Sequence, residues 1–145
     1  MIYTDAGTLE IVAAQHGGGL EHFTHPGLYP PTGFTHVVTF GSEPYADVSL
    51  IQSNYGTVGN FEVVAVRPDG SMHHWFRNND LSMPSWAAGA LFGADANGGV
   101  ALIQSNYDVQ GNFGVVTSQL WGGLRHYYRR NDVYPTFPWV TGPAF

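Results

Sequence analysis

The sequence contains no cysteine and no lysine, and only 11% of its residues are charged. Without cysteine, the chain can form no disulfide, no thiolate zinc site and no cysteine nucleophile. Its five basic residues are all arginines and stand against eleven acidic residues, which gives a net charge of −6. Binding along nucleic-acid phosphates and contact with an acidic membrane surface both need dense positive charge, so we expect neither kind of partner.

Long apolar runs and catalytic motifs are also missing. No stretch approaches the length of a membrane span, and the amino-terminal MIYTDAGTLE lacks the basic and apolar regions of a signal peptide. We therefore expect no membrane insertion and no export signal, while the compartment stays open. Because neighbouring residues of a strand point to opposite faces, the adjacent His73 and His74 cannot chelate one metal together. We expect no metal and no cofactor.

The composition favours one compact β-rich domain. Hydrophobic residues make up 43% of the chain, which is enough for a packed core. Nineteen glycines and nine prolines indicate many turns, and 14% aromatic residues are typical of strands.

A repeat with an offset of 52 residues runs through the chain. IQSNYGTVGNF, beginning at Ile51, returns as IQSNYDVQGNF, beginning at Ile103. One step earlier, LEIV at residues 9–12 falls on FEVV at residues 61–64, in a fainter third copy. We predict a single domain, 1–145, with repeats at about 1–47, 48–99 and 100–145.

Each repeat is predicted to form four short antiparallel strands. In the second repeat these cover residues 48–53, 61–67, 71–77 and 86–92, with a Pro-Asp-Gly hairpin turn at 68–70. The strand at 61–67 is apolar on both faces, so its sheet must lie between two neighbours, as a blade of a β-propeller does. The predicted fold is therefore an all-β propeller segment of about three blades.

Three blades leave a strand edge and a blade face uncovered, since propellers close with about four to eight blades. The innermost strand of the first repeat is absent or reduced to residues 2–4. We expect the ring to be completed by a homo-oligomer, with a six-bladed dimer favoured. The other possibility is that the chain is a piece of a longer ring.

The motifs QSNYGTVGNFEVV, GSMHHWFRNND and SWAAGALFG, in this order, resemble the repeat of the Photorhabdus-type lectins. These are bacterial β-propellers that bind fucose and related, sometimes O-methylated, sugars between blades. The resemblance covers nearly all of the second and third repeats and, more weakly, the first. It implies a non-catalytic, multivalent lectin with two well-formed sites per chain. The chain departs from the family in its blade number, which is usually seven, and in HFTHPGLYPPTG of the first repeat.

Strand direction brings the repeated polar residues to one rim, since the loops after the first and third strands of a blade emerge on the same side. Amide, carboxylate and guanidinium groups bind sugar hydroxyls, and aromatic rings cover the apolar face of a sugar. The resemblance adds weight to the tryptophans. The candidate carbohydrate-binding residues are Asn54, Tyr55, Trp75, Arg77, Asn79, Asp80, Trp86, Asn106, Tyr107, Tyr127, Arg129, Asn131, Asp132 and Trp139.

Structural roles are open for several of these residues. Asn54 and Asp80 are typical of turns that are tied by a side chain, and Arg77 could form an ion pair with Asp80. Trp75 suits packing between blades as well as it suits a sugar platform. The repeated histidines at 22, 74 and 126 are interpreted as buried, hydrogen-bonded core residues.

No enzyme is predicted. A glycosidase needs a pair of positioned carboxylates, whereas the repeated Glu10 and Glu62 become Gly114 in the third repeat. No HExxH, GxSxG or phosphate-loop motif occurs. The alternative to a lectin is a structural or protein-interaction propeller module.

Overall fold

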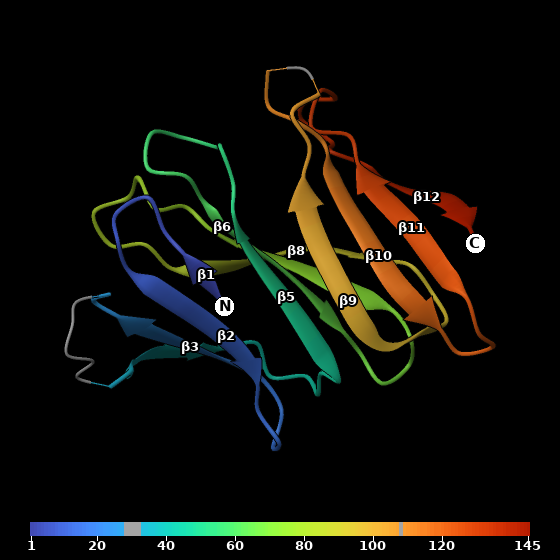
Figure 1. The fold of residues 1–145 in the computed structure, drawn as a ribbon, viewed down its shortest axis with the longest axis horizontal. Coiled ribbons are helices and arrows are strands. Elements are labelled where there is room, and N and C mark those ends of the chain that lie inside the picture. The colour runs from blue at the N-terminus through green and yellow to red at the C-terminus, as the bar shows by residue number, and fades with distance from the viewer. Residues whose placement is uncertain (28–32, 108) are drawn as a thin grey trace.

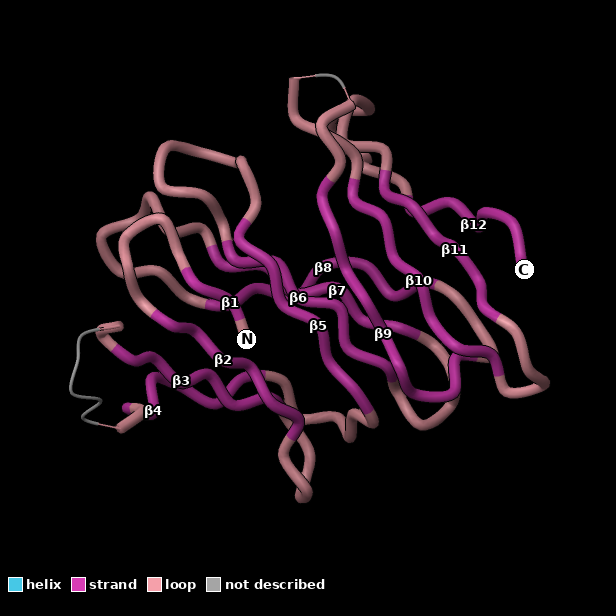
Figure 2. The backbone as a smooth tube through the Cα atoms, in the orientation of Figure 1, coloured by secondary structure: helices cyan, strands magenta, loops and turns pink. Residues whose placement is uncertain are grey.

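The computed structural model describes residues 1–27, 33–107 and 109–145, and all of its regular elements are β-strands (Figures 1 and 2). Within these residues no helix is long and apolar enough to cross a membrane. The described residues form twelve strands in three four-stranded antiparallel sheets, which we name the N-terminal, central and C-terminal sheets. In each sheet the strands lie side by side in chain order, so strands that follow one another in the chain are hydrogen-bonded neighbours.

The strand bounds follow the 52-residue repeat. The N-terminal sheet consists of β1 (Ile2–Tyr3), β2 (Leu9–Ala14), β3 (Leu20–His25) and β4 (Thr35–Phe40). The central sheet consists of β5 (Asp47–Gln52), β6 (Phe61–Val66), β7 (Met72–Arg77) and β8 (Trp86–Phe92). The C-terminal sheet consists of β9 (Ala96–Gln104), β10 (Phe113–Gln119), β11 (Leu124–Arg129) and β12 (Trp139–Ala144).

The prediction of four-stranded antiparallel sheets is confirmed. The central strands match their predicted bounds to within one residue, and β1 is reduced to two residues as expected. Equivalent residues also keep their register, since His22, His74 and His126 each lie opposite a valine of the preceding strand.

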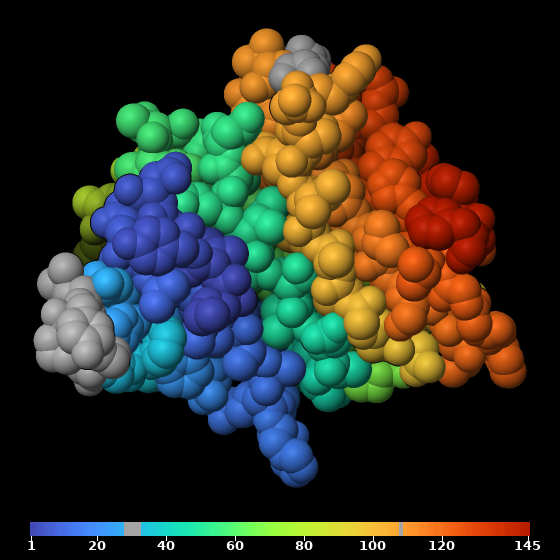
Figure 3. Space-filling view, in the orientation of Figure 1, coloured from blue at the N-terminus to red at the C-terminus, as the bar shows by residue number. Residues whose placement is uncertain are grey.

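The central sheet lies between the other two. Its inner strand β5 packs against β2 on one side and against β9 on the other, and the green central segment separates the blue and orange ends of the molecule in Figures 1 and 3. All six residues of β6 are buried, as predicted from its two apolar faces.

Two separate cores result from this layering. Alternate residues of β6 enter each core, because side chains of a strand point to opposite faces. Phe61, Val63 and Ala65 pack against the N-terminal sheet, and Val64 and Val66 pack against the C-terminal sheet.

The outward faces of the two end sheets have no such cover within the described chain. Met72 is fully buried in the central sheet, whereas its counterpart Leu124 is 41% exposed. On the opposite side, Val63 is fully buried and its counterpart Ile11 is only half-buried. Each end sheet therefore presents the apolar face that the central sheet keeps buried.

Candidate functional site

A cavity of about 400 Å³ opens between the central and C-terminal sheets. It is walled mainly by aromatic side chains, with a guanidinium, an amide and a carboxylate among them. Its lining residues are Tyr55, Asn60, Glu62, Phe76, Arg129, Tyr134 and Phe137, and we call it the aromatic cavity. Four of them, Tyr55, Asn60, Glu62 and Phe76, come from the central sheet and the loop before β6.

Arg129, at the end of β11, provides the positive charge of the cavity. Its guanidinium carbon lies 4.2 Å from the centre of the Phe113 ring, 5.3 Å from that of Phe137 and 5.7 Å from that of Tyr55. Its Nε donates a hydrogen bond to Oδ1 of Asn131 at 2.6 Å. Although Arg129 is only 9% exposed, it forms no ion pair within the described residues. A cation held by rings and one amide keeps its remaining N–H donors for another partner.

Tyr55 contributes an unsatisfied polar atom to the same cavity. Its hydroxyl oxygen is buried and has no hydrogen bond of good geometry among the described residues, although the Arg129 guanidinium lies beside the ring. Burial raises the pKa of this hydroxyl, against the opposing charge of Arg129. Buried polar groups are nearly always paired, so an unpaired hydroxyl beside a cavity is a candidate ligand contact.

The Glu62 carboxylate is held in place by the protein. Nε2 of His74 donates to its Oε2 at 2.8 Å, and Oγ of Ser53 donates to its Oε1 at 3.2 Å. Burial lowers the pKa of His74, although the Glu62 carboxylate opposes this shift. The core role predicted for His22 and His74 is confirmed, since both are buried and bonded to a glutamate, whereas His126 is only half-buried.

The equivalent interface between the N-terminal and central sheets carries the same kinds of group in a more polar setting. The guanidinium carbon of Arg77 lies 5.4 Å from the centre of the Phe61 ring. Burial lowers the pKa of Arg77, against the charge of Glu10. Burial would raise the pKa of Glu10, but hydrogen bonds from His22, Thr8 and Thr24 outweigh it and hold the pKa below its ordinary value.

The predicted rim residues of the central sheet act mainly as loop ties. Both Asp80 carboxylate oxygens accept backbone N–H groups, from Thr57 and Val58, each at 2.8 Å. Nδ2 of Asn79 donates to the carbonyl oxygen of Gly59 at 2.7 Å. The alternative of an Arg77–Asp80 ion pair is wrong, because the Asp80 oxygens are engaged by the loop 56–59.

In the C-terminal sheet, only one of the two residues equivalent to Asn79 and Asp80 holds a loop. Asn131 repeats the tie of Asn79, since its Nδ2 donates to the carbonyl oxygen of Gly111. Asp132 is exposed and pairs with Arg130 at 2.8 Å instead of holding a loop.

The predicted tryptophans pack between sheets. Trp86 stacks on Phe40 with ring centres 4.3 Å apart, and Trp139 stacks on Phe92 at 3.8 Å. Each of these two indoles has a buried Nε1 without a partner among the described residues. Tyr127 is buried between the central and C-terminal sheets, where its hydroxyl donates to the Ala94 carbonyl oxygen at 3.1 Å.

The remaining predicted residues lie at the surface, in the loops between β5 and β6 and between β9 and β10, which we call the inner loops. Asn54 joins two sheets, because its Oδ1 accepts a bond from Nε2 of Gln104 at 2.7 Å and its backbone N–H donates to Oε1 of the same residue. Asn106 and Tyr107 are exposed, and Tyr107 retains 69% of its accessible surface.

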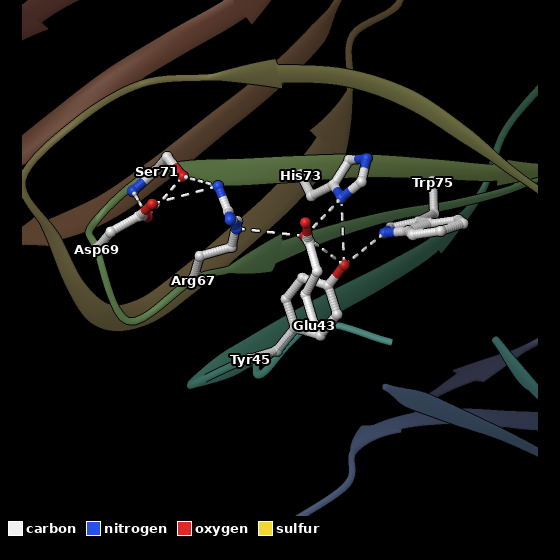
Figure 4. Close-up of polar contacts among 7 residues, drawn as sticks. All are labelled: Glu43, Tyr45, Arg67, Asp69, Ser71, His73 and Trp75. Carbon is white, nitrogen blue, oxygen red and sulfur yellow. Dashed lines mark hydrogen bonds and ion pairs between the residues drawn. The ribbon is translucent and has the colours of Figure 1, made fainter. Parts of the chain in front are cut away.

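A second polar cluster binds the connection between β4 and β5 to the central sheet (Figure 4). Glu43 lies 3.2 Å from Nε of Arg67 and 3.4 Å from Nδ1 of His73. The Tyr45 hydroxyl lies 3.1 Å from the same His73 nitrogen and accepts a hydrogen bond from Nε1 of Trp75 at 3.1 Å. These groups partner one another, so the cluster fastens this connection and gives Trp75 a structural role.

Sequence reasoning did not select five of the cavity residues as candidates, the amide Asn60 among them. Phe76, Tyr134 and Phe137 line the cavity as aromatic walls, and Glu62 as a fixed acceptor. The loop at 78–85 of the second repeat has no aromatic residue, so a search for repeated residues passes over Tyr134 and Phe137. The signal available was two aromatic residues within the loop that follows Arg129.

The described residues contain no group of three or more acidic, histidine or cysteine side chains placed to hold a metal ion. Neither models of known protein families nor curated protein sequences match this chain.

Proposed function

We propose that the chain is a segment of a β-propeller lectin that binds neutral or deoxy sugars, such as fucose or O-methylated monosaccharides, between its blades. The observation that carries the proposal is Arg129, a buried guanidinium without an ion pair among the described residues, set among rings at the edge of the aromatic cavity. Its free N–H donors suit sugar hydroxyls, and the rings suit C–H or methyl groups.

The choice of a neutral sugar follows from the balance of charge in the cavity. Arg129 and Glu62 both line it, so the two charges offset each other. The Glu62 oxygens are already bonded to His74 and Ser53. Apolar walls around a few fixed polar groups are the usual construction of a specific small-molecule site.

Calorimetric titration with fucose and with O-methylated fucose tests this proposal. We expect saturable binding that is reduced by Phe137→Ala, since this substitution removes one wall of the cavity. Absence of saturable binding to these sugars and to any glycan of a broad array would refute it.

The alternative function is a structural or protein-interaction propeller module. It is favoured by the structural contacts of Trp75, Trp86 and Tyr127, which place many of the predicted sugar-binding rings in the packing between sheets. A chain that binds partner proteins through its exposed inner loops and no glycan would support this function.

We propose further that two copies associate head to tail into a six-bladed ring. The uncovered face of the C-terminal sheet corresponds to the face by which the central sheet packs on the C-terminal sheet. The uncovered face of the N-terminal sheet corresponds to the face by which the central sheet packs on the N-terminal sheet, so the two uncovered faces are complementary in kind. Light scattering should give about twice the 15.8 kDa chain mass. A mass of one chain across the whole concentration range would contradict this assembly.

A further inference from the structure

A histidine–glutamate pair is built into two of the three sheets in the same way. Nε2 of His22 bonds Oε2 of Glu10 at 2.8 Å, and Nε2 of His74 bonds Oε2 of Glu62 at 2.8 Å. Both pairs are buried, and both glutamates also accept a hydroxyl hydrogen bond.

The C-terminal sheet keeps the histidine of this pair and lacks the carboxylate. Gly114 occupies the glutamate position, opposite Ile103 and Tyr128, as Glu62 lies opposite Ile51 and Phe76. Its backbone does not require glycine, because its φ lies outside the left-handed region. A Cβ there would lie 3.5 Å from Nε2 of His126 and 3.4 Å from the Ile103 side chain, so the direction of a side chain is toward the histidine.

The donors that hold Glu62 in the central sheet are preserved around Gly114. Ser105 corresponds to Ser53, and its Oγ accepts the backbone N–H groups of Asn112 and Tyr107, which leaves its O–H free to donate. His126 has no hydrogen bond or ion pair within the described part of the chain. Two donors that bind a carboxylate elsewhere in this fold therefore stand together without one.

A cavity of about 250 Å³ lies at this place. It is lined by Ile103, Ser105, Asn112, Phe113, Gly114, His126 and Tyr128, so its walls are largely apolar around the two free donors. These are the surroundings that a small carboxylate with a short apolar tail requires.

We propose that the C-terminal sheet binds the carboxylate of a small organic acid or acidic sugar in this cavity, in the place that the glutamate side chain takes in the other two sheets. One carboxylate oxygen accepts Nε2–H of His126, and the other accepts the Ser105 hydroxyl. The site recognises a negative group, in contrast to the neutral-sugar site proposed at the aromatic cavity, and does not depend on that proposal. It lies on the uncovered face of the C-terminal sheet, so in the proposed six-bladed ring the second copy would close its open side.

Acetate is the probe, because it reproduces the end of a glutamate side chain. Titration at pH 7, followed through the His126 ring resonances by NMR, should show saturable shifts with a dissociation constant of about 1–10 mM, as suits a ligand of four heavy atoms. Sodium chloride at the same ionic strength should leave these resonances unmoved. Ser105→Ala should weaken acetate binding by about tenfold, the effect of one lost hydrogen bond to a charged group.

The decisive variant is Gly114→Glu. The introduced carboxylate should pair with His126, raise the melting temperature and abolish the acetate-dependent shifts. The matched variant Glu62→Gly should lower the melting temperature, and acetate should restore part of the loss, which gives a readout independent of the His126 resonances.

Three outcomes would overturn the proposal. The first is equal acetate shifts in the wild type and in Gly114→Glu, or equal shifts with chloride. The second is the absence of a saturable shift in the wild type up to about 100 mM acetate, ten times the upper dissociation constant expected for so small a ligand. The third is loss of the acetate shifts at the protein concentrations where light scattering gives the mass of two chains, which would assign the cavity to a side chain of the second copy.

Discussion

Arg129→Met separates a ligand-binding role of the aromatic cavity from a structural one. Methionine keeps most of the apolar stem of arginine and removes the guanidinium, so the packing against Phe113 and Phe137 is largely preserved. The loss is then confined to the charge, its contacts with the rings and its hydrogen bond to Asn131.

The expected change in stability is small, because large contributions oppose each other. A desolvated cation over an aromatic ring contributes about 2 kcal/mol, and a hydrogen bond of a charged donor about 1.5–3 kcal/mol. Against these, burying a guanidinium costs several kcal/mol, which the Glu62 carboxylate in the same cavity offsets only in part, because Arg129 is 9% exposed and forms no ion pair within the described residues. We therefore expect the free energy of unfolding to change by less than about 1.5 kcal/mol.

The expected change in sugar affinity is larger. Losing charged hydrogen bonds to a bound sugar costs about 1.5–3 kcal/mol, which corresponds to about a 10- to 150-fold weaker affinity. Titration calorimetry with fucose measures the affinity, and urea unfolding measures the stability. Arg130→Met is the matched control, because this neighbouring arginine is exposed and pairs with Asp132, away from the cavity. Its sugar affinity should equal that of the wild type.

Two results would refute this reasoning. A decrease of more than about 3 kcal/mol in the free energy of unfolding of Arg129→Met would show that the guanidinium mainly stabilises the interface between the sheets, as expected when a buried network is broken. Unchanged sugar affinity in a folded Arg129→Met variant would show that the ligand lies elsewhere.

Three further predictions concern stability and the second interface. Trp139→Ala should lower the free energy of unfolding by about 2–3 kcal/mol in urea, because a half-buried ring stacked on Phe92 is lost. The control is Trp121→Ala, which should change the free energy of unfolding by less than about 0.5 kcal/mol, because Trp121 is 87% exposed. Equal effects of the two substitutions would contradict the assignment of Trp139 to packing. Burial lowers the pKa of His74, so on acidification the unfolded chain takes up this proton before the folded chain does. Stability should therefore fall as the pH drops below the ordinary histidine pKa of about 6.5, by at most about 1.4 kcal/mol per pH unit for this group, as thermal unfolding at several pH values can measure. A stability that rises from pH 7 to pH 5 would argue against a neutral buried His74. Arg77→Met should halve the number of sugars bound per chain if both interfaces bind, and an unchanged calorimetric stoichiometry would restrict binding to the aromatic cavity.

The architecture was largely predictable because its signal is local and repeated. Strand period, hairpin turns and the 52-residue offset each depend on neighbours along the chain, and they placed the central strands to within one residue. The two buried faces of β6 were also readable, since Phe61 and Val64 point opposite ways in any strand.

The candidate site was less predictable, because the same residue type makes different contacts at equivalent positions of the repeat. Asp80 ties a loop and Asp132 pairs with an arginine, although both occupy the same place in the repeat. Trp86 and Trp139 face neighbouring sheets, which depends on how sheets stack and not on strand direction.

The sequence by itself determined the all-β class, the strands and the repeat, because alternation and turn chemistry act between residues close in the chain. Only the tertiary structure decided that Tyr55, Phe137 and Arg129 meet in one cavity, since they come from two sheets and a non-repeated loop. It also decided that Gly114 leaves His126 beside a cavity, because that requires the side chains of adjacent strands to converge on one face.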